Sequence, residues 1–381
     1  MVVINDEAQI KMAPTKVLLQ TAEDIVTDFS NASRIFDDAN LDRLSTFSRA
    51  EIKTGRIIGR GGFCTVTEIA AIRNGNGRGA FLRRERSHSP AMSMSHNGDE
   101  MSAKVYIVFS CNRGKGSRYV IKQVAEESLH TNRIAFLKGT VDLALEAKFL
   151  SSLSHPNIVE LKGVSEGGPF REGYFLVMDR LHETLPTKLK KWMTTDRQCK
   201  GITGFFAGGK KKINALFVDR MTAAYGVAMA LNYLHSLRIV YRDLVCGRVI
   251  CLARCFKPFK DLSSRPLSPQ KPDNIGFDAQ GNVKLFDFGL AKELRDSDKT
   301  VNGLYKLTGF TGSIRYMAPE VGLRLPYNQK VDNCKYTVGC LAMYSPSVSR
   351  PDNRFHFFCR LLQHAHVVHN GLGASIWLLH S

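Results

Sequence analysis

A lysine at the end of an otherwise apolar strand, Tyr119-Val120-Ile121-Lys122, constrains the fold of this chain more than any other feature. An ammonium group that points into a core needs an acidic partner, because desolvating an unpaired charge is costly. Residues 141–153 have helical spacing, which places Glu146 on the apolar stripe of that helix. We therefore expect Glu146 to pair with Lys122, so that the strand and the helix pack together. Alternatively, the two residues are unrelated and both charged groups lie in solvent.

A glycine-rich turn lies between two β-rich segments within residues 56–69. It contains Gly59, Gly61 and Gly62, and glycine lacks the Cβ that would keep backbone N–H groups away from a phosphate. Val66 follows the turn and is placed to pack on an adenine ring. Considered alone, the segment fits a plain hairpin turn better than a phosphate-binding turn.

Four motifs occur in a fixed order in the second half of the chain. They are Tyr241-Arg242-Asp243-Leu244, Lys271-Pro272-Asp273-Asn274, Asp287-Phe288-Gly289 and Ala318-Pro319-Glu320. Each motif is a weak signal by itself, but the ordered set resembles the eukaryotic protein kinase family, over roughly residues 51–332. The resemblance implies an α+β, two-lobed protein-kinase-like fold with a small β-rich N-lobe and a larger, mainly helical C-lobe. Lys271 and the segment 312–320 resemble Ser/Thr kinases more than Tyr kinases.

The resemblance also implies roles for individual residues, with ATP and Mg²⁺ as cofactors. Lys122, paired with Glu146, holds the α- and β-phosphates, and Asp243 accepts the proton of the substrate hydroxyl. Lys271 is a further catalytic residue. The residues implied to bind the nucleotide are Gly59, Gly61, Gly62, Val66, Lys122, Met178, Asp179 and Leu181, with the last three at the hinge between the lobes. The residues implied to bind Mg²⁺ are Asn274 and Asp287.

A turn at residues 278–281 separates two short β-rich runs, which predicts a β-hairpin. Asn274 precedes the first run and Asp287 follows the second. We therefore expect these two side chains to come together in space.

Two features depart strongly from the family. Residues 245–270 separate Leu244 from Lys271, whereas in the family the catalytic loop runs directly from one motif into the next. Removing this insertion leaves an uninterrupted Tyr-Arg-Asp-Leu-Lys-Pro-Asp-Asn, and its end residues are compatible with a retained intron. After Asp332 the family pattern stops, so we expect a truncated C-lobe. The smaller departures are Cys64 in place of a third glycine and Tyr241 in place of histidine.

We expect four segments along the chain. Residues 1–50 are polar and form a leader or a short helical extension without a core of its own, and regular structure starts near Glu51. Residues 51–180 are the N-lobe, with a mobile insertion at about 72–117. The remaining segments are a partial C-lobe at 181–332, with the insertion 245–270, and a tail at 333–381 that does not match the family.

The composition fits a globular chain, since 44% of the residues are hydrophobic and 23% are charged. The formal net charge of +18 favours acidic protein substrates, and no stretch is long and apolar enough to span a membrane. We expect a cytoplasmic or nuclear protein that meets protein substrates and an upstream activating kinase, with no membrane association. The basic segments 188–212 and 83–86 lack interleaved aromatic residues, so we do not expect nucleic acid as a partner.

The function that follows from the resemblance is that of a protein serine/threonine kinase, which transfers the γ-phosphoryl group of ATP to Ser or Thr hydroxyls of proteins. The interrupted catalytic loop leaves an alternative open, namely a catalytically impaired, kinase-like nucleotide-binding or scaffold protein.

The segment between Asp287 and Glu320 carries two candidate regulatory residues, Thr308 and Thr311. Arg242, next to the catalytic Asp, is the type of residue that pairs with a phosphate and orders such a segment. We expect phosphorylation of one of these threonines to activate the protein, with Thr308 favoured over Thr311. Two exposed threonines in a polar loop remain the alternative.

Overall fold

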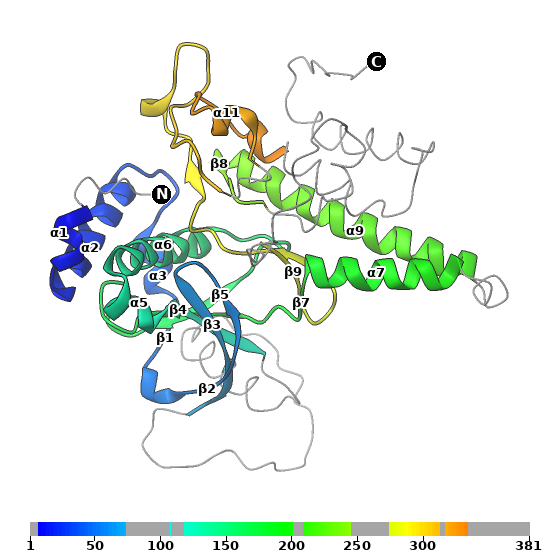
Figure 1. Ribbon diagram of the computed structural model, residues 1–381, viewed down its shortest axis with the longest axis horizontal. Coiled ribbons are helices and arrows are strands. Elements are labelled where there is room, and N and C mark those ends of the chain that lie inside the picture. Colours follow the sequence, from blue (N-terminus) through cyan, green and yellow to red (C-terminus); the bar gives the residue numbers. More distant parts are fainter. Residues whose placement is uncertain are drawn as a thin grey trace, which may run out of the picture.

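The computed structural model describes residues 7–73, 107, 118–200, 209–244, 274–312 and 317–333. These residues form a β-rich N-lobe and a mainly helical C-lobe (Figure 1), so the predicted α+β fold class is confirmed. Several predicted features lie outside the described residues. They are Lys271, most of the insertion at 72–117, the insertion 245–270 and the tail from residue 334 onward.

The N-lobe contains a six-stranded sheet in the order β1-β5-β6-β4-β3-β2. Its strands are β1 Ser45–Phe47, β2 Ile52–Arg60, β3 Cys64–Ile72, β4 Tyr119–Val124, β5 Leu161–Ser165 and β6 Phe175–Asp179. Neighbouring strands are antiparallel except β1 and β5, which run parallel. Side chains alternate between the two faces of a strand, so Val120 and Ile121 enter different hydrophobic clusters. Lys122 therefore shares the face of Val120.

Helix α6 (Arg133–Ser152) follows the short helix α5 (Glu126–Thr131) and packs against β4. It begins earlier than the predicted start at residue 141, because the side chain of Asn132 caps it by accepting a hydrogen bond from Ala135 N at 3.0 Å. Its apolar residues are buried on two sides, with Leu143 in the main core and Val141 in a separate cluster. Glu146 is 2% exposed.

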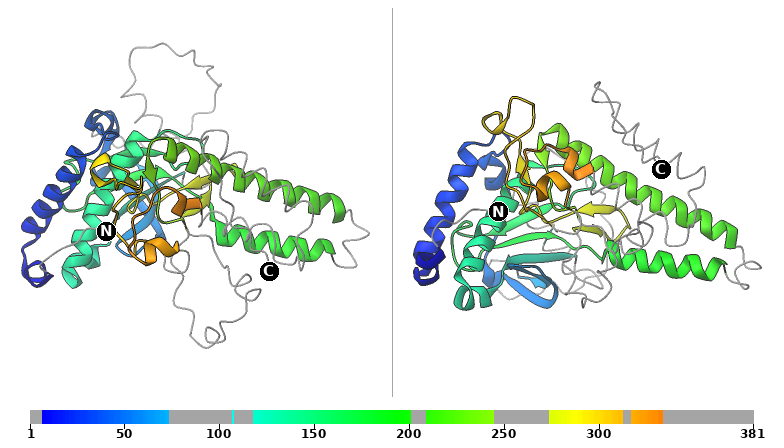
Figure 2. Two further views of the ribbon diagram at one scale, coloured as in Figure 1. Left: turned by 90° about the horizontal axis from the view of Figure 1, so that it is seen from above. Right: turned by 45° about the horizontal axis from the view of Figure 1, so that its top comes forward.

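Two long helices of the C-lobe, α7 (Leu185–Lys200) and α9 (Gly209–Ser236), run side by side away from the sheets, as Figure 2 shows. Helix α9 begins at Gly209, so the basic segment 188–212 contributes to both helices. Trp192 anchors α7 by packing edge-on against Phe277 and donating a hydrogen bond to Asp219 at 2.7 Å.

Short strands complete the C-lobe. They are β7 Glu183–Thr184, β8 Ile239–Val240, β9 Ile275–Phe277, β10 Val283–Leu285 and β11 Lys292–Glu293. β9 pairs with β10 and β7, and β11 pairs with β8. The short helix α11 (Pro319–Gly322) follows, together with the 3₁₀ turns Arg49–Glu51 and Asp296–Asp298 elsewhere in the chain. Within the described ranges, none of the helices combines the length and the hydrophobicity that a membrane span requires.

Regular structure does not start near Glu51, so this prediction is wrong. The N-terminal extension forms helices α1 (Glu7–Met12), α2 (Thr15–Asn31) and α3 (Asp38–Asp42), followed by strand β1. The apolar stripe of α2 packs against α6, and neither helix would bury these side chains without the other. The extension therefore shares a core with the N-lobe.

Candidate active site

Lys122 on β4 lies within contact distance of two carboxylates. Its Nζ is 2.5 Å from Glu146 Oε2 on α6 and 3.0 Å from Asp287 Oδ1, which follows β10. Burial alone lowers the pKa of Lys122, but the carboxylates of Asp287 and Glu146 outweigh burial and raise it. Burial raises the pKa of Glu146, and the nearby Lys122 opposes this shift. The ion pair inferred from the sequence is therefore present, and it includes a third charged group.

The predicted hairpin is formed by β9 and β10, with Ile275 opposite Leu285. Phe286 N donates a hydrogen bond to Asn274 O at 3.2 Å, so the residues at the two ends of the hairpin are neighbours. Asn274 Nδ2 also donates to the carbonyl and to the carboxylate of Asp243, both at 2.8 Å. The hairpin thus brings one predicted metal ligand directly against the predicted catalytic base.

Asn274 also has the features of a metal ligand. Its side chain is fully buried, and its Oδ1 has no hydrogen-bond partner among the described residues. Amide and carboxylate oxygens are the ligands that Mg²⁺ prefers. The pairing of Asn274 with Asp287 at the ends of one hairpin therefore fits a hard divalent cation.

Asp332 holds the catalytic loop in place. Its carboxylate accepts hydrogen bonds from Tyr241 N and Arg242 N, both at 2.8 Å, and its Oδ2 lies 3.1 Å from His235 Nε2. The side chain is fully buried. Sequence reasoning noted Asp332 but missed these partners, because the bonded residues are far apart in the chain.

Aromatic packing links the catalytic loop to α6. The Phe288 ring is edge-on to Tyr241 at 5.2 Å between centroids, and it lies 6.5 Å from Phe149 on α6. The Tyr241 hydroxyl donates to Phe286 O, and burial together with the charges of Asp287 and Asp243 raises its pKa well above the usual value. Tyr241 therefore occupies the position of the usual histidine as a neutral, buried side chain.

Asp142 is a second acidic residue of α6 near the site that sequence reasoning missed. Burial raises its pKa to about 7, and the charges of Asp287 and Glu146 add to this shift. A Cβ at Gly289 would lie 3.2 Å from the Asp142 Cβ, so glycine permits this close approach of α6. The signal in the sequence was the spacing of Asp142 one helical turn before Glu146.

The glycine turn connects β2 and β3, with Gly61 N donating to Cys64 O at 2.7 Å. Gly59 lies opposite Val66, which in turn lies opposite Lys122 on β4. Burial raises the pKa of the Cys64 thiol to about 12, although Lys122 opposes this shift. The predicted phosphate-facing turn and the predicted phosphate-binding lysine are thus on neighbouring strands.

The predicted hinge begins at the end of β6, which contains Met178 and Asp179, and continues to Leu181. Met178 is buried in the core, and the backbone N–H groups of Asp179, Arg180 and His182 all donate to other backbone carbonyls. Leu181, by contrast, has no backbone hydrogen bond within the part of the chain that the structure describes. Its N–H and C=O are therefore the groups of the hinge best suited to meet a ligand.

The comparisons with known proteins agree with this geometry. A family model described as protein tyrosine and serine/threonine kinase matches residues 104–351. The match begins after the glycine turn and ends beyond Asp332.

Several relatives show the same similarity. Ribosomal protein S6 kinase alpha-1 of Homo sapiens is 26% identical over 258 residues, which are 66% of this chain and 26% of that protein. Ribosomal protein S6 kinase alpha-6 of Danio rerio is 28% identical over 223 residues, which are 57% of this chain and 21% of that protein. The chain spans about a quarter of the length of these relatives. Since the family model matches more than half of the chain, the protein belongs to the protein tyrosine and serine/threonine kinase family of eukaryotic protein kinases.

Proposed function

We propose that this protein is an ATP-dependent protein kinase that transfers the γ-phosphoryl group of ATP to Ser or Thr hydroxyls of protein substrates. One observation carries the proposal: Lys122 contacts both Glu146 and Asp287, while Asn274 contacts Asp243. Phosphoryl transfer depends on positioning and charge neutralisation more than on covalent chemistry by the protein. A cation, a general base and two oxygen ligands for a hard metal ion are the groups that it needs.

Each group has a proposed role. Asp243, oriented by Asn274, accepts the proton of the attacking hydroxyl. Lys122, oriented by Glu146, binds the α- and β-phosphates. Asn274 Oδ1 and the Asp287 carboxylate would hold Mg²⁺, which when bound supplies charge that neutralises the β- and γ-phosphates. Lys271 has a catalytic role only by resemblance.

Two segments support binding of the nucleotide. The turn of Gly59, Gly61 and Gly62 lies near Lys122, because Gly59 is opposite Val66 and Val66 is opposite Lys122. Apart from Gly62 and its two chain neighbours, none of the described residues has an atom within 4 Å of where a Cβ at Gly62 would be. That open space lets phosphate oxygens approach the backbone. At the hinge, Leu181 offers one donor and one acceptor to the edge of an adenine ring. Met178 and Asp179, at the end of β6, would then contribute mainly by positioning Leu181.

The segment 245–270 is the reason to keep the impaired nucleotide-binding or scaffold protein as the second candidate. It lies outside the described residues, yet Asn274, which follows it, contacts both the carbonyl and the carboxylate of Asp243. This contact supports an active site that survives the interruption. It says nothing of Lys271, whose position depends on the same segment.

Deleting residues 245–270 is expected to raise kcat for phosphorylation of a generic Ser/Thr substrate by about tenfold or more, equivalent to about 1.4 kcal/mol of barrier. The reason is that the deletion makes Lys271 adjacent to Leu244, as in an uninterrupted catalytic loop. The affinity for Mg·ATP should change by less than about threefold, because the nucleotide is proposed to bind at the hinge and at β4. Phosphate transfer from labelled ATP and isothermal titration with Mg·ATP measure the two effects. If the full chain binds Mg·ATP and only the deletion variant transfers phosphate, the full chain is the impaired protein. If neither binds Mg·ATP, the proposed function is wrong.

The charge distribution supports acidic protein substrates. Lys190 on α7 and Lys210, Lys211 and Lys212 on α9 are exposed, and the two helices lie side by side. Lys191 is exposed as well but pairs with Glu183 at 2.6 Å. We place such a protein, with its substrates and an activating kinase, in the cytoplasm or nucleus.

Replacing Thr308 by Ala is expected to lower kcat by about tenfold in protein that an upstream kinase has activated. Thr308 is partly exposed, and its carbonyl accepts a hydrogen bond from the Tyr327 hydroxyl at 2.8 Å. The same hydroxyl lies 3.4 Å from Arg242 Nη1, so Thr308 is connected to Arg242 through Tyr327. Thr311 is 2% exposed and donates to Thr308 O, so a kinase cannot reach it without local unfolding. Phosphopeptide mapping and steady-state kinetics check this prediction, with Ser297→Ala as an exposed control in the same segment. Full activity of T308A would show that the segment is ordered without this phosphate.

A further inference from the structure

Residues 15–38 of the N-terminal extension contact the elements that carry the proposed active site. We call these residues the brace. Its helix α2 buries Leu18, Ala22 and Val26 against α6, the helix that carries Glu146. In Figures 1 and 2, α2 lies along α6 on the side away from α7 and α9. Any movement of α6 away from β4 would therefore have to carry the brace with it or break this interface.

The brace also continues the aromatic packing of the active site. Phe36 is edge-on to Phe149 of α6 at 4.8 Å between centroids, and Phe149 lies 6.5 Å from Phe288. Phe288 in turn packs on Tyr241 of the catalytic loop. A side chain of the N-terminal extension is thus two ring contacts away from the residue that follows Asp287.

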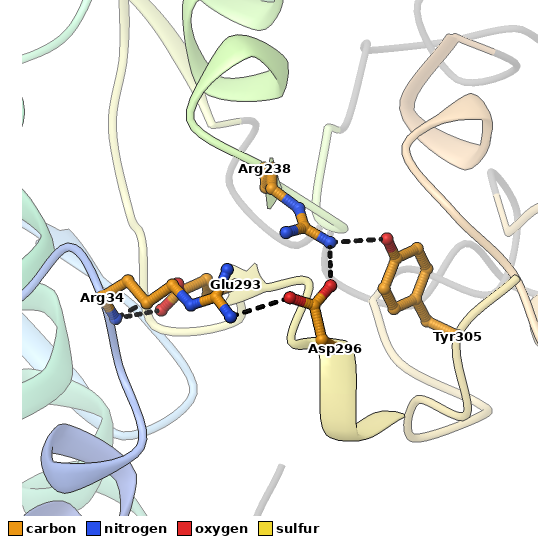
Figure 3. A network of polar contacts seen from close by, with 5 residues as sticks. All are labelled: Arg34, Arg238, Glu293, Asp296 and Tyr305. Carbon is orange, nitrogen blue, oxygen red and sulfur yellow. Dashed lines mark hydrogen bonds and ion pairs between the residues drawn. The ribbon is translucent and has the colours of Figure 1, made fainter. Parts of the chain in front are cut away.

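A third contact joins the brace to the segment that follows the site (Figure 3). Ser33 Oγ donates to Glu293 at 2.7 Å, and Arg34 N donates to the same carboxylate at 3.2 Å. Arg34 Nη2 lies 2.7 Å from Asp296, which also pairs with Arg238 at 2.6 Å. Asp296 therefore links the brace to the residue that precedes β8.

The position of Glu293 explains why these bonds matter. Glu293 is 4% exposed and lies opposite Ile239 in the β8–β11 pair. Strand β8 leads directly into Tyr241 of the catalytic loop. Its side-chain hydrogen bonds within the described residues come from Ser33 and Arg34. A buried carboxylate is stable only with donors around it. Without the brace, β11 would have to expose Glu293, and the pairing of β11 with β8 would weaken.

We propose that Ser33, Arg34 and Phe36 are positioning residues for phosphoryl transfer: they hold α6 and β11 in the arrangement in which Lys122 meets Glu146 and Asp287. This inference rests on the proposed kinase function. Among the described residues, the hydrogen bonds, ion pairs and ring contacts of the brace involve neither the glycine turn nor Leu181, so its effect falls on the arrangement of catalytic groups and not on nucleotide binding.

The test uses the full chain and two kinds of variant. Phe36→Ala removes the ring contact, and the double variant Ser33→Ala/Arg34→Ala removes the polar contacts to Glu293 and Asp296. Arg43→Ala is the matched control, because Arg43 is an exposed arginine of the same extension whose side chain makes no hydrogen bond, ion pair or ring contact with the described residues. Phe36→Leu keeps an apolar side chain at position 36 and serves as the conservative variant.

Two measurements separate positioning from mere structural support. Hydrogen exchange of residues 143–150 and 292–298 should be about tenfold faster in F36A and S33A/R34A, while residues 223–234 of α9 exchange as in the wild type. In steady-state kinetics, kcat should fall about tenfold with KM for ATP changed less than threefold, and F36L should restore most of kcat.

Other outcomes overturn the inference. If F36A and S33A/R34A have the same exchange rates and the same kcat as R43A, the brace does not hold α6 and β11 in place. Faster exchange with an unchanged kcat shows a structural contact without a positioning role. If the wild-type chain binds Mg·ATP but transfers no phosphate, the proposed function fails, and the positioning role in phosphoryl transfer fails with it. Exchange then decides separately whether the brace holds α6 and β11: rates equal to those of R43A show that it does not, and faster exchange shows that it does.

Discussion

Lys122→Met is expected to abolish phosphoryl transfer, lowering kcat/KM by about a thousandfold or more, or about 4 kcal/mol. The substitution keeps an apolar stem of similar length but removes the cation that lies 2.5 Å from Glu146 and 3.0 Å from Asp287. Without it, the α- and β-phosphates lose their positive partner, and two carboxylates remain close together in the site. Both effects oppose binding of the triphosphate in a reactive position.

The same substitution carries a cost in stability. Removing one member of a buried ion pair costs about 3–5 kcal/mol, a large part of the about 5–15 kcal/mol that stabilises a domain. The double variant Lys122→Met/Glu146→Gln removes both charges and should recover most of the lost free energy of unfolding but none of the activity. Lys53→Met, an exposed lysine on β2 of the same sheet, is the matched control.

Steady-state phosphate transfer and urea denaturation of the three variants distinguish these effects. Loss of activity in the stable double variant assigns the effect to the phosphate site and not to unfolding. Wild-type turnover in K122M or in the double variant would falsify the proposed role of Lys122.

Asp243→Asn is expected to lower kcat by about 100-fold to 10,000-fold, the range for loss of a general base. An asparagine at 243 can still accept the hydrogen bond from Asn274 Nδ2, which spans 2.8 Å in the native protein, but it cannot take a proton from the substrate hydroxyl. The nucleotide contacts proposed for Lys122 and Leu181 are unaffected. We therefore expect affinity for Mg·ATP to change by less than about threefold.

Asp332→Asn is the comparison that separates the base from its support. Asn has one carbonyl oxygen where Asp332 uses two to accept from Tyr241 N and Arg242 N, so one buried N–H loses its partner, at about 1–3 kcal/mol. This variant should lose stability as well as kcat, whereas D243N should lose kcat alone. Titration calorimetry, thermal unfolding and kinetics on both variants are the measurements. A D243N protein that binds Mg·ATP much more weakly would contradict the role of Asp243 as a base.

Much of the proposed site could be predicted from local sequence. Lys122 and Glu146 were paired because each interrupts an apolar pattern whose geometry is known, one with the period of a strand and one with the period of a helix. Asn274 and Asp287 were brought together by a turn of defined length between two short runs. These patterns are local, so they survive in a single sequence.

The sequence does not reveal that the N-terminal extension packs on the N-lobe, because this contact is not local. Its first 50 residues are polar on average, although Leu18, Ala22 and Val26 recur at helical spacing. A stripe that narrow predicts a stable helix only if a partner surface covers it. That surface is α6, more than 100 residues further along the chain. The limits of the four expected segments stay a prediction.

The sequence by itself determined the family, the two-lobed fold and the candidate catalytic groups, because ordered motifs and apolar periodicity are properties of neighbouring residues. Only the tertiary structure decided which donors satisfy Asp332 and Glu293, and which hinge residue keeps its backbone groups available. A buried carboxylate must find donors wherever the packed chain provides them, and those donors lie 90 residues away for Asp332 and 260 for Glu293. Hydrogen bonds between residues so far apart produce no periodic pattern in the sequence, so only the tertiary structure shows them.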